Sequence, residues 1–346
     1  MRIIEVRGRL QTSRVLVGEE FQHVGSYLRG RSAFFVTDAN VHRHYADSFP
    51  SAAGIVLECG ERAKTMETVQ RVYRGLSDRG ADRSWFILGI GGGVVCDIAG
   101  FVAGTYMRGL PFGFVSTSLL SQVDASVGGK NGVNLDGYKN MIGLFLQPEF
   151  VLCDPNLLKT LPEEEIGNGL AEVIKHGLIG DPALLSLLED RAADIRARDP
   201  QAMALLVHDS VRFKASVVER DEVETGERKI LNFGHTLAHA AETVFGLPHG
   251  RAVAVGMVFA LRLSRKAGFL KDLALPARLV RLLNLHGLPA TLDRDPGPLL
   301  ESVAKDKKKS GGAVDIVLLE KAGCPRLLKI SLEELREEIL DLRQPE

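Results

Sequence analysis

Short apolar runs rich in β-branched and aromatic residues alternate with helical patterns over the first half of the chain. These runs occupy residues 2–7, 13–17, 33–37, 54–57, 85–90, 112–115 and 150–153. Residues 65–79, between two of the runs, have the apolar spacing of an amphipathic helix. Strands that alternate with helices predict a mostly parallel sheet with helices on both faces. Ligands of such sheets bind at the carboxyl ends of the strands.

The pattern changes after Leu161-Pro162, where three glutamates follow the proline. Proline and acidic residues are typical of the first turn of a helix. Helical periodicity then dominates to residue 287, and a hairpin over residues 313–319 and 327–330 precedes a final helix. We therefore predict an α/β Rossmann-like domain over residues 1–161 and a mainly α-helical domain over residues 162–346.

Composition excludes several classes of partner. The 43 basic and 44 acidic residues nearly cancel, so nucleic acid is not an expected partner. The longest apolar run, residues 252–261, is far shorter than the roughly 20 residues that span a bilayer. Cysteines without a metal or disulfide spacing are typical of reduced thiols that serve as packing residues in a cytoplasmic protein. They are Cys59, Cys96, Cys153 and Cys324.

Three of the nine histidines lie within one short stretch. His235 and His239 are four apart in residues 234–244, a run of helix formers, so both rings should project from one helix face. His249 follows Gly246-Leu247-Pro248, which should end that helix and turn the chain back. This arrangement could hold zinc or a similar ion, but two ordinary helix histidines explain it equally well without a carboxylate ligand.

Glycines follow the most apolar strand, as Gly89-Ile90-Gly91-Gly92-Gly93. Only glycine lets backbone amides approach a pyrophosphate so closely, and a helix start follows. The run is not Gly-x-Gly-x-x-Gly, and the candidate ribose ligands Asp38 and Asn40 precede the glycines. These two alone would be read as an Asx turn. We predict a dinucleotide in a variant of the usual site, where Glu61 and Lys64 either add contacts or are simply solvated.

Several polar residues remain open between a functional and a structural interpretation. Residues 116–140 combine hydroxyls, a carboxylate, paired glycines and two lysines, which predicts a polar loop around an anionic ligand. Glu172 and Lys175 are three apart, as in a plain intrahelical ion pair. Lys214 lies on a predicted helix at about residues 200–218, and Arg228 lies in a charged cluster that alone would be read as a solvated face. Residues 305–312 read as a mobile basic loop.

Together these motifs resemble the 3-dehydroquinate synthases, a family of sugar phosphate cyclases. The resemblance covers nearly the whole chain and is carried by residues 91–97, 106–109, 119–130, 139–143, 170–177, 231–240, 249–250 and 306–308. It implies an NAD-binding α/β domain, a helical C-terminal domain, an active site in the cleft between them and a homodimer. One departure is Ser116-Thr117-Ser118, where the family usually has Pro-Thr-Thr; the hydroxyls are kept and a rigid turn is lost.

The resemblance also implies the metal ligands and the substrate. Zinc or cobalt would be held by Glu172, His235 and His249, so that His239 is instead a substrate contact. The substrate would be 3-deoxy-D-arabino-heptulosonate 7-phosphate, converted to 3-dehydroquinate and phosphate by transient oxidation with NAD, elimination, re-reduction and aldol closure. The phosphate would be surrounded by Lys130, Asn140, Lys175, His239, Lys307 and, from a partner subunit, Arg108.

The remaining implied site residues fall into two groups. The rest of the substrate pocket would consist of Lys214, Asn232, Arg228 on the carboxylate, Asp124 on a ring hydroxyl, and Glu224 in support of the basic residues. NAD would contact Asp38, Asn40, Glu61, Lys64, Gly92, Gly93, Asp97, Thr117, Ser118, Lys130, Lys139, Thr160 and Leu161.

Three alternatives remain. A valiolone or deoxy-inosose type of cyclase would use a sugar phosphate without a carboxylate. A metal-dependent polyol dehydrogenase would turn NAD over, and a degenerate relative would only bind or scaffold.

Overall fold

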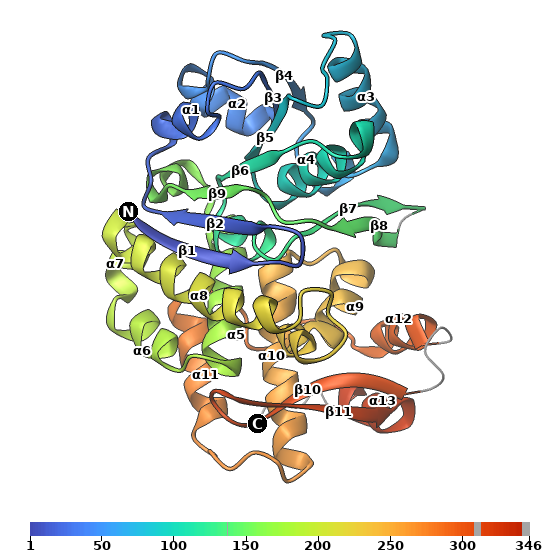
Figure 1. Ribbon diagram of the computed structural model, residues 1–346. Coiled ribbons are helices and arrows are strands. Elements are labelled where there is room, and N and C mark those ends of the chain that lie inside the picture. The colour runs from blue at the N-terminus through green and yellow to red at the C-terminus, as the bar shows by residue number, and fades with distance from the viewer. Residues whose placement is uncertain (137, 308–312, 341–346) are drawn as a thin grey trace. The chain divides into compact units, whose positions relative to one another are not determined.

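The computed structural model describes residues 1–136, 138–307 and 313–340 (Figure 1). The chain divides into two compact units: Met1–Pro162 with Arg198–Val223, and Glu163–Ala197 with Glu224–Glu346. The first unit therefore includes a helix that the sequence pattern placed in the helical domain, α8 (Pro200–Arg220). Two carboxylates hold α8 at the turn after the first strand, because Glu219 accepts the Arg7 N–H at 3.0 Å and Glu222 accepts the Arg9 N–H at 2.8 Å.

A seven-stranded sheet organises the first unit, in the order β1-β2-β9-β6-β5-β3-β4. All neighbouring pairs are parallel except β1 with β2. The mostly parallel sheet predicted from the sequence is thus confirmed. The strands are β1 (Arg2–Arg7), β2 (Thr12–Val17), β3 (Ala33–Asp38), β4 (Ala53–Leu57), β5 (Phe86–Gly91), β6 (Phe112–Ser116) and β9 (Phe150–Cys153).

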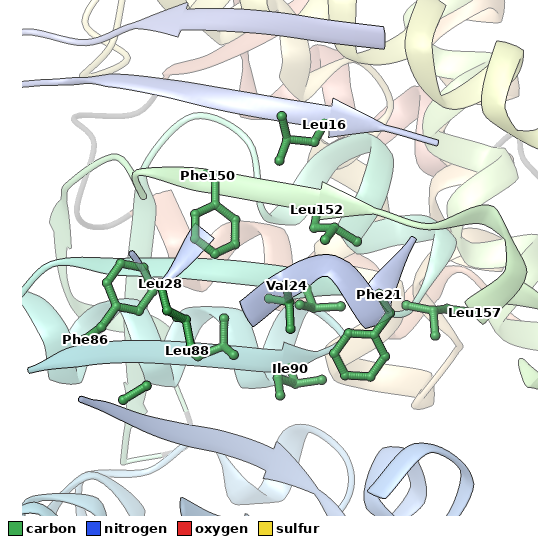
Figure 2. Packing of buried hydrophobic residues seen from close by; sticks show 12 residues of the cluster. Leu16, Phe21, Val24, Leu28, Phe86, Leu88, Ile90, Phe150, Leu152 and Leu157 are labelled. Carbon is green, nitrogen blue, oxygen red and sulfur yellow. The ribbon is translucent and has the colours of Figure 1, made fainter. Parts of the chain in front are cut away.

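The inner strand β5, which lies between β6 and β3, is buried on both faces, as its continuous apolar sequence requires. Phe86, Leu88 and Ile90 pack into one cluster with side chains from the short helix α1 (Val24–Tyr27) and from β9 (Figure 2). On the other face, Gly89 lies so close to the helix α4 (Gly93–Thr105) that an added Cβ would be 3.0 Å from Ala99. Burial of each Phe or Leu side chain contributes roughly 1.5–3 kcal/mol to the free energy of folding. This packing therefore holds β5 in place, and with it the position of its carboxyl end.

The helices between the strands are α1, α2 (Ala39–Tyr45), α3 (Met66–Ser77) and α4, which follows directly on β5. The helix α8 belongs to the same unit but follows the last strand of the sheet. The segment predicted as a polar loop around an anionic ligand, residues 116–140, contains regular structure instead. It includes a π-helical segment, Ser121–Ala125, and reaches into an antiparallel hairpin of β7 (Lys130–Leu135) and β8 (Tyr138–Phe145).

The second unit is mainly helical, as predicted. Its helices are α5 (Glu163–Ile179), α6 (Ala183–Asp190), α7 (Ala192–Arg196), α9 (His235–Phe245), α10 (His249–Lys266), α11 (Leu275–Leu285), α12 (Gly297–Lys307) and α13 (Leu332–Leu340). A hairpin of β10 (Ala313–Lys321) and β11 (Cys324–Ser331) precedes α13.

The basic segment expected as a mobile loop begins inside α12, because residues 305–307 are helical. Residues 308–312 lie outside the described part of the chain, and so does the side chain of the predicted substrate residue Lys307. Among the described residues, no helix is both long and apolar enough to cross a membrane. The four cysteines are free thiols, but Cys59 is exposed and is therefore not the packing residue that was expected.

Candidate functional site

Three potential metal ligands converge in the second unit from three different helices. Glu172 lies on α5, His235 begins α9 and His249 begins α10. Their ligand atoms lie within 4.8 Å of one another. Both imidazoles direct Nε2 at the same carboxylate oxygen, since Oε1 of Glu172 is 3.0 Å from His249 and 3.6 Å from His235. The missing carboxylate of the histidine motif is therefore supplied from a helix more than sixty positions upstream.

Close backbone contacts set the spacing of these helices. An added Cβ on Gly250 would lie 2.6 Å from the Cα of Asn168, whose side chain accepts the Gly250 N–H at 2.7 Å. An added Cβ on Gly256 would lie only 2.0 Å from the carbonyl oxygen of Gly234. The first contact seats α10 on α5, and the second seats the start of α9 on α10. These glycines are required for close approach, and together they determine where the three ligands meet.

The second nitrogen of each imidazole faces an acceptor. Nδ1 of His235 lies 3.2 Å from the backbone oxygen of Phe233, and Nδ1 of His249 lies 2.7 Å from Oε1 of Glu242. A carbonyl and an ionised carboxylate only accept, so both Nδ1 atoms carry the proton. Both Nε2 atoms are thereby available to a cation, which is the arrangement found around ligating histidines in general.

The charges around the two histidines differ. Burial lowers the pKa of His235 to about 3, with a further contribution from the positive charge of Lys175. Burial alone would also lower the pKa of His249, but its hydrogen bonds to Glu172 and Glu242 outweigh that effect and raise it to about 10. Lys175 forms a buried ion pair with Glu172, as the three-residue spacing predicted. Because a ligating nitrogen must be deprotonated, a cation bound here would replace the proton on Nε2 of His249.

The donor set suits a zinc-like cation. Two imidazole nitrogens and one carboxylate oxygen are the ligand types that zinc and cobalt accept. Glu172 is fully buried, whereas the side chains of His235 and His249 are 12% and 28% exposed. Three protein ligands with one partly open side leave a coordination position for a substrate oxygen, as a catalytic ion requires.

Other predicted substrate residues of the second unit differ in their solvent exposure and in their hydrogen-bond partners. The rings of His235 and His239 are 5.3 Å apart, and His239 is exposed. Arg228 is 1% exposed, so it is not on the solvated face that its charged neighbours suggested. The side-chain amide of Asn232 donates to Glu224 at 2.8 Å, which places those two predicted residues together.

A cluster in the first unit joins residues that the resemblance assigned to NAD and to the substrate. Lys64 is 4% exposed and donates both to Asp97 and, at 2.6 Å, to the side-chain oxygen of Asn140. Burial raises the pKa of Asp97 to about 6, although Lys64 opposes the shift. Asn134 was missed by the sequence interpretation: its side chain donates to Glu61 and accepts from the backbone N–H of Asn140, both at 2.8 Å. Asn134 lies on β7, and no local sequence pattern distinguishes it.

The glycine run forms the turn from β5 into α4. Gly92 caps the N-terminus of α4 and Gly93 begins the helix. An added Cβ on Gly92 would lie 3.3 Å from the Ser118 hydroxyl, and the Thr117 N–H binds the carbonyl of Gly91 at 3.0 Å. The loop after β6 therefore lies against the start of a thirteen-residue helix. Backbone amides at such a helix start suit a pyrophosphate.

The remaining predicted NAD residues are placed as follows. Asp38 caps α2, because one of its carboxylate oxygens accepts hydrogen bonds from the backbone N–H groups of Asn40 and Val41 at 2.9 and 3.0 Å. The interpretation of this segment as an Asx turn is therefore correct. The Thr160 hydroxyl lies 2.8 Å from that of Tyr45, and Leu161 follows it.

Lys214 and Asp124 form a tight pair within the first unit. The ammonium of Lys214 donates to a carboxylate oxygen and to the backbone oxygen of Asp124, both at 2.6 Å. Lys214 is 5% exposed. The pair explains why α8 carries a lysine on its buried side.

Three predicted cationic residues are solvent-accessible. Lys130 and Lys139 lie exposed on the β7–β8 hairpin. Arg108 has φ +70° beside Met107 at φ +48°, followed by Gly109 at φ +119°. Two non-glycine residues in the left-handed region store strain of about 1–3 kcal/mol each, which often marks a functional turn.

Comparison with known proteins places these features in a family. Residues 54–168 match the family described as 3-dehydroquinate synthase N-terminal, and residues 169–309 match 3-dehydroquinate synthase C-terminal. The chain is 45% identical to the 3-dehydroquinate synthase of Halorhodospira halophila over 308 residues, 87% of each chain. It is 40% identical to that of Symbiobacterium thermophilum over 326 residues, 88% of this chain and 91% of the relative.

Solved structures show the same fold. ValA, a 2-epi-5-epi-valiolone synthase from Streptomyces hygroscopicus with NAD+ and Zn2+ bound, is 27% identical, with a TM-score of 0.87 and 99% of both chains covered. A 2-deoxy-scyllo-inosose synthase complexed with carbaglucose-6-phosphate, NAD+ and Co2+ is 24% identical, with a TM-score of 0.87 and coverage of 98% and 100%. The second likeness concerns the fold alone.

Proposed function

The chain belongs to the 3-dehydroquinate synthase family, and from this premise we propose that it converts 3-deoxy-D-arabino-heptulosonate 7-phosphate to 3-dehydroquinate and phosphate, as an NAD- and metal-dependent lyase. The observation that carries the proposal is the convergence of Glu172, His235 and His249, in a chain 45% identical to a 3-dehydroquinate synthase. The first unit would hold NAD and the second would hold zinc or cobalt.

The reaction needs a cation and a redox cofactor that end each turnover unchanged. When bound, the cation would lower the pKa of a substrate hydroxyl and NAD would take up and return a hydride. Glu172, His235 and His249 would present three ligands and leave the remaining position to the substrate. Lys175 would keep the Glu172 carboxylate oriented through their ion pair.

Charged side chains of the first unit would bind the polar parts of the substrate. Lys214 holds the Asp124 carboxylate in place, so that Asp124 could accept a hydrogen bond from a ring hydroxyl. Lys130 and Asn140 would contact the phosphate, and Lys64 would orient Asn140 from behind. We further propose a homodimer, in which the strained, exposed turn at Arg108 would reach the phosphate site of the neighbouring subunit.

A carboxylate-binding residue separates the proposed substrate from those of the related cyclases. Arg228 would grip the substrate carboxylate with two parallel N–H groups. Because a charged pair of this kind contributes about 2–4 kcal/mol, Arg228→Ala should lower kcat/KM for the heptulosonate about 30- to 1000-fold. Unchanged kinetics would favour a substrate without a carboxylate.

Cofactor balance tests the reaction type. The protein is incubated with heptulosonate phosphate and a small catalytic amount of NAD, and phosphate and NADH are followed together. The proposal predicts many equivalents of phosphate per NAD with no accumulation of NADH. One NADH for each substrate consumed would instead identify a polyol dehydrogenase, and absence of any turnover would indicate a binding protein.

A further inference from the structure

Glu242 lies directly behind one of the three converging ligands. Its Oε1 is 2.7 Å from Nδ1 of His249, while Nε2 of the same ring is 3.0 Å from Glu172. The side chain of Glu242 is 6% exposed. The imidazole is therefore held at both nitrogens, between one carboxylate that faces the site and one that lies outside it.

The sequence places Glu242 on the face of α9 that carries the histidines. It lies seven residues after His235 and three after His239, so all three project from one side of the helix. The start of α10, which carries His249, is placed against this face by the αL residue Gly246 (φ +63°) and the short segment that follows it. One helix thus supplies both a ligand and a contact to the next ligand.

The contact fixes the chemical form of His249. An ionised carboxylate can only accept, so the bond keeps a proton on Nδ1, and Nε2 is the nitrogen left for a cation once it is deprotonated. The ring cannot turn about its bond to Cβ without breaking a buried, charge-assisted hydrogen bond. A ligand that is already oriented loses less conformational freedom when the ion binds.

The charge of Glu242 also balances the site. A divalent cation together with Lys175 brings three positive charges, and Glu172 alone offsets one of them. The second carboxylate reduces the remaining excess in a poorly solvated region, where an uncompensated charge is costly. Glu242 is therefore expected to affect the affinity for the ion and not the chemistry of the substrate.

We propose that Glu242 is a positioning residue for the metal centre: it accepts the Nδ1–H of His249, aims Nε2 at the cation and raises the affinity of the site. The inference rests on the proposed function, because it requires that Glu172, His235 and His249 bind an ion. In this role Glu242 acts through His249 and is not itself a ligand of the ion.

The test is a Co2+ titration of metal-depleted full-length protein, followed by the visible absorption of the bound ion, with Zn2+ competition to obtain the affinity. Glu242→Ala should weaken Co2+ binding about 10- to 100-fold and shift the absorption bands, because the ring loses its support. Glu242→Gln keeps an acceptor of the same shape without the charge and should lose less. The matched control is Glu189→Ala, which removes a glutamate of the same unit that is paired with Arg278; it should bind Co2+ like the wild type.

The outcomes separate the inference from the function on which it rests. Wild-type affinity and absorption in Glu242→Ala, with Co2+ bound by the wild type, would overturn the positioning role alone. Failure of the wild type to bind Co2+ would overturn the proposed metal site and the inference with it. If circular dichroism shows that Glu242→Ala does not fold, Glu242→Gln decides, and unchanged affinity and absorption in that variant would refute the inference.

Discussion

Replacement of Gly256 by alanine should disturb the metal centre without touching a ligand. Gly256 lies inside α10, where its backbone meets the backbone at the start of α9. An added Cβ would lie 2.0 Å from the oxygen, 2.9 Å from the carbonyl carbon and 3.3 Å from the Cα of Gly234. All three atoms belong to the main chain, so no side chain can rotate away and the two helices must separate.

The size of the effect follows from these distances. Carbon and oxygen atoms in contact lie about 3.3–3.6 Å apart, so an oxygen at 2.0 Å means that the helices must move by about 1.3–1.6 Å at this point. Overpacking of this kind costs about 1–3 kcal/mol. His235 follows Gly234 directly, and a metal site tolerates ligand displacements of only about 0.2 Å. We therefore expect Zn2+ affinity and kcat to fall by about 100-fold or more, because a 1 Å misplacement has effects of that size.

A second glycine of the same unit provides the control. Gly167 lies in α5, where an added Cβ would meet only the side chain of Leu288, at an ordinary 3.5 Å. Gly167→Ala should therefore be neutral, or stabilising by up to about 1 kcal/mol, since alanine favours the helix. Urea unfolding of the metal-free protein and Zn2+ titration by calorimetry measure both effects. Equal stability and equal Zn2+ affinity of the two variants would refute the account of how α9 and α10 are spaced.

Two further predictions concern the first unit. The pKa of Asp97 is raised from its ordinary 3.8 to about 6, so the native state holds this proton more tightly than the unfolded state. The free energy of unfolding should therefore fall as the pH rises from about 4 to about 6, by at most about 3 kcal/mol. Asp97→Asn should remove this component in urea titrations across the range, and an identical pH profile for the two proteins would contradict the shift. Lys214→Met should lower the free energy of unfolding by about 1–3 kcal/mol, since it removes a charged partner from Asp124. A double-mutant cycle with Asp124→Asn should show a coupling energy of about 1–2 kcal/mol. A coupling near zero would mean that the pair contributes nothing to stability.

The sheet was predictable because its strands differ sharply in pattern from their surroundings. The strand at Phe86–Gly91 is buried on both faces and reads as a continuous apolar run, so its position was recognisable from the sequence. The hairpin of β7 and β8 was missed because neither strand alternates regularly between apolar and polar residues, and the apolar residues Tyr138, Met141 and Phe145 of β8 are exposed. A strand without a clear apolar alternation gives no periodic signal.

Contacts between distant segments were beyond the reach of local patterns. The helix Pro200–Arg220 has ordinary helical periodicity, and nothing in that pattern shows that it belongs with the sheet. Its attachment depends on Glu219 and Glu222, which accept backbone N–H groups some two hundred residues away. Likewise, the histidine motif alone could not identify Glu172 as its carboxylate; the resemblance to a known family supplied that assignment.

The central claim is that Glu172, His235 and His249 hold one catalytic ion. It is tested most directly by adding Zn2+ or Co2+ in small steps to metal-depleted protein with heptulosonate phosphate and NAD, while phosphate release is measured. The account predicts release that rises to a plateau at one ion per chain in the wild type, and almost none at any metal concentration in Glu172→Gln. Rapid release from protein shown to contain no metal, or a normal plateau in Glu172→Gln, would contradict it.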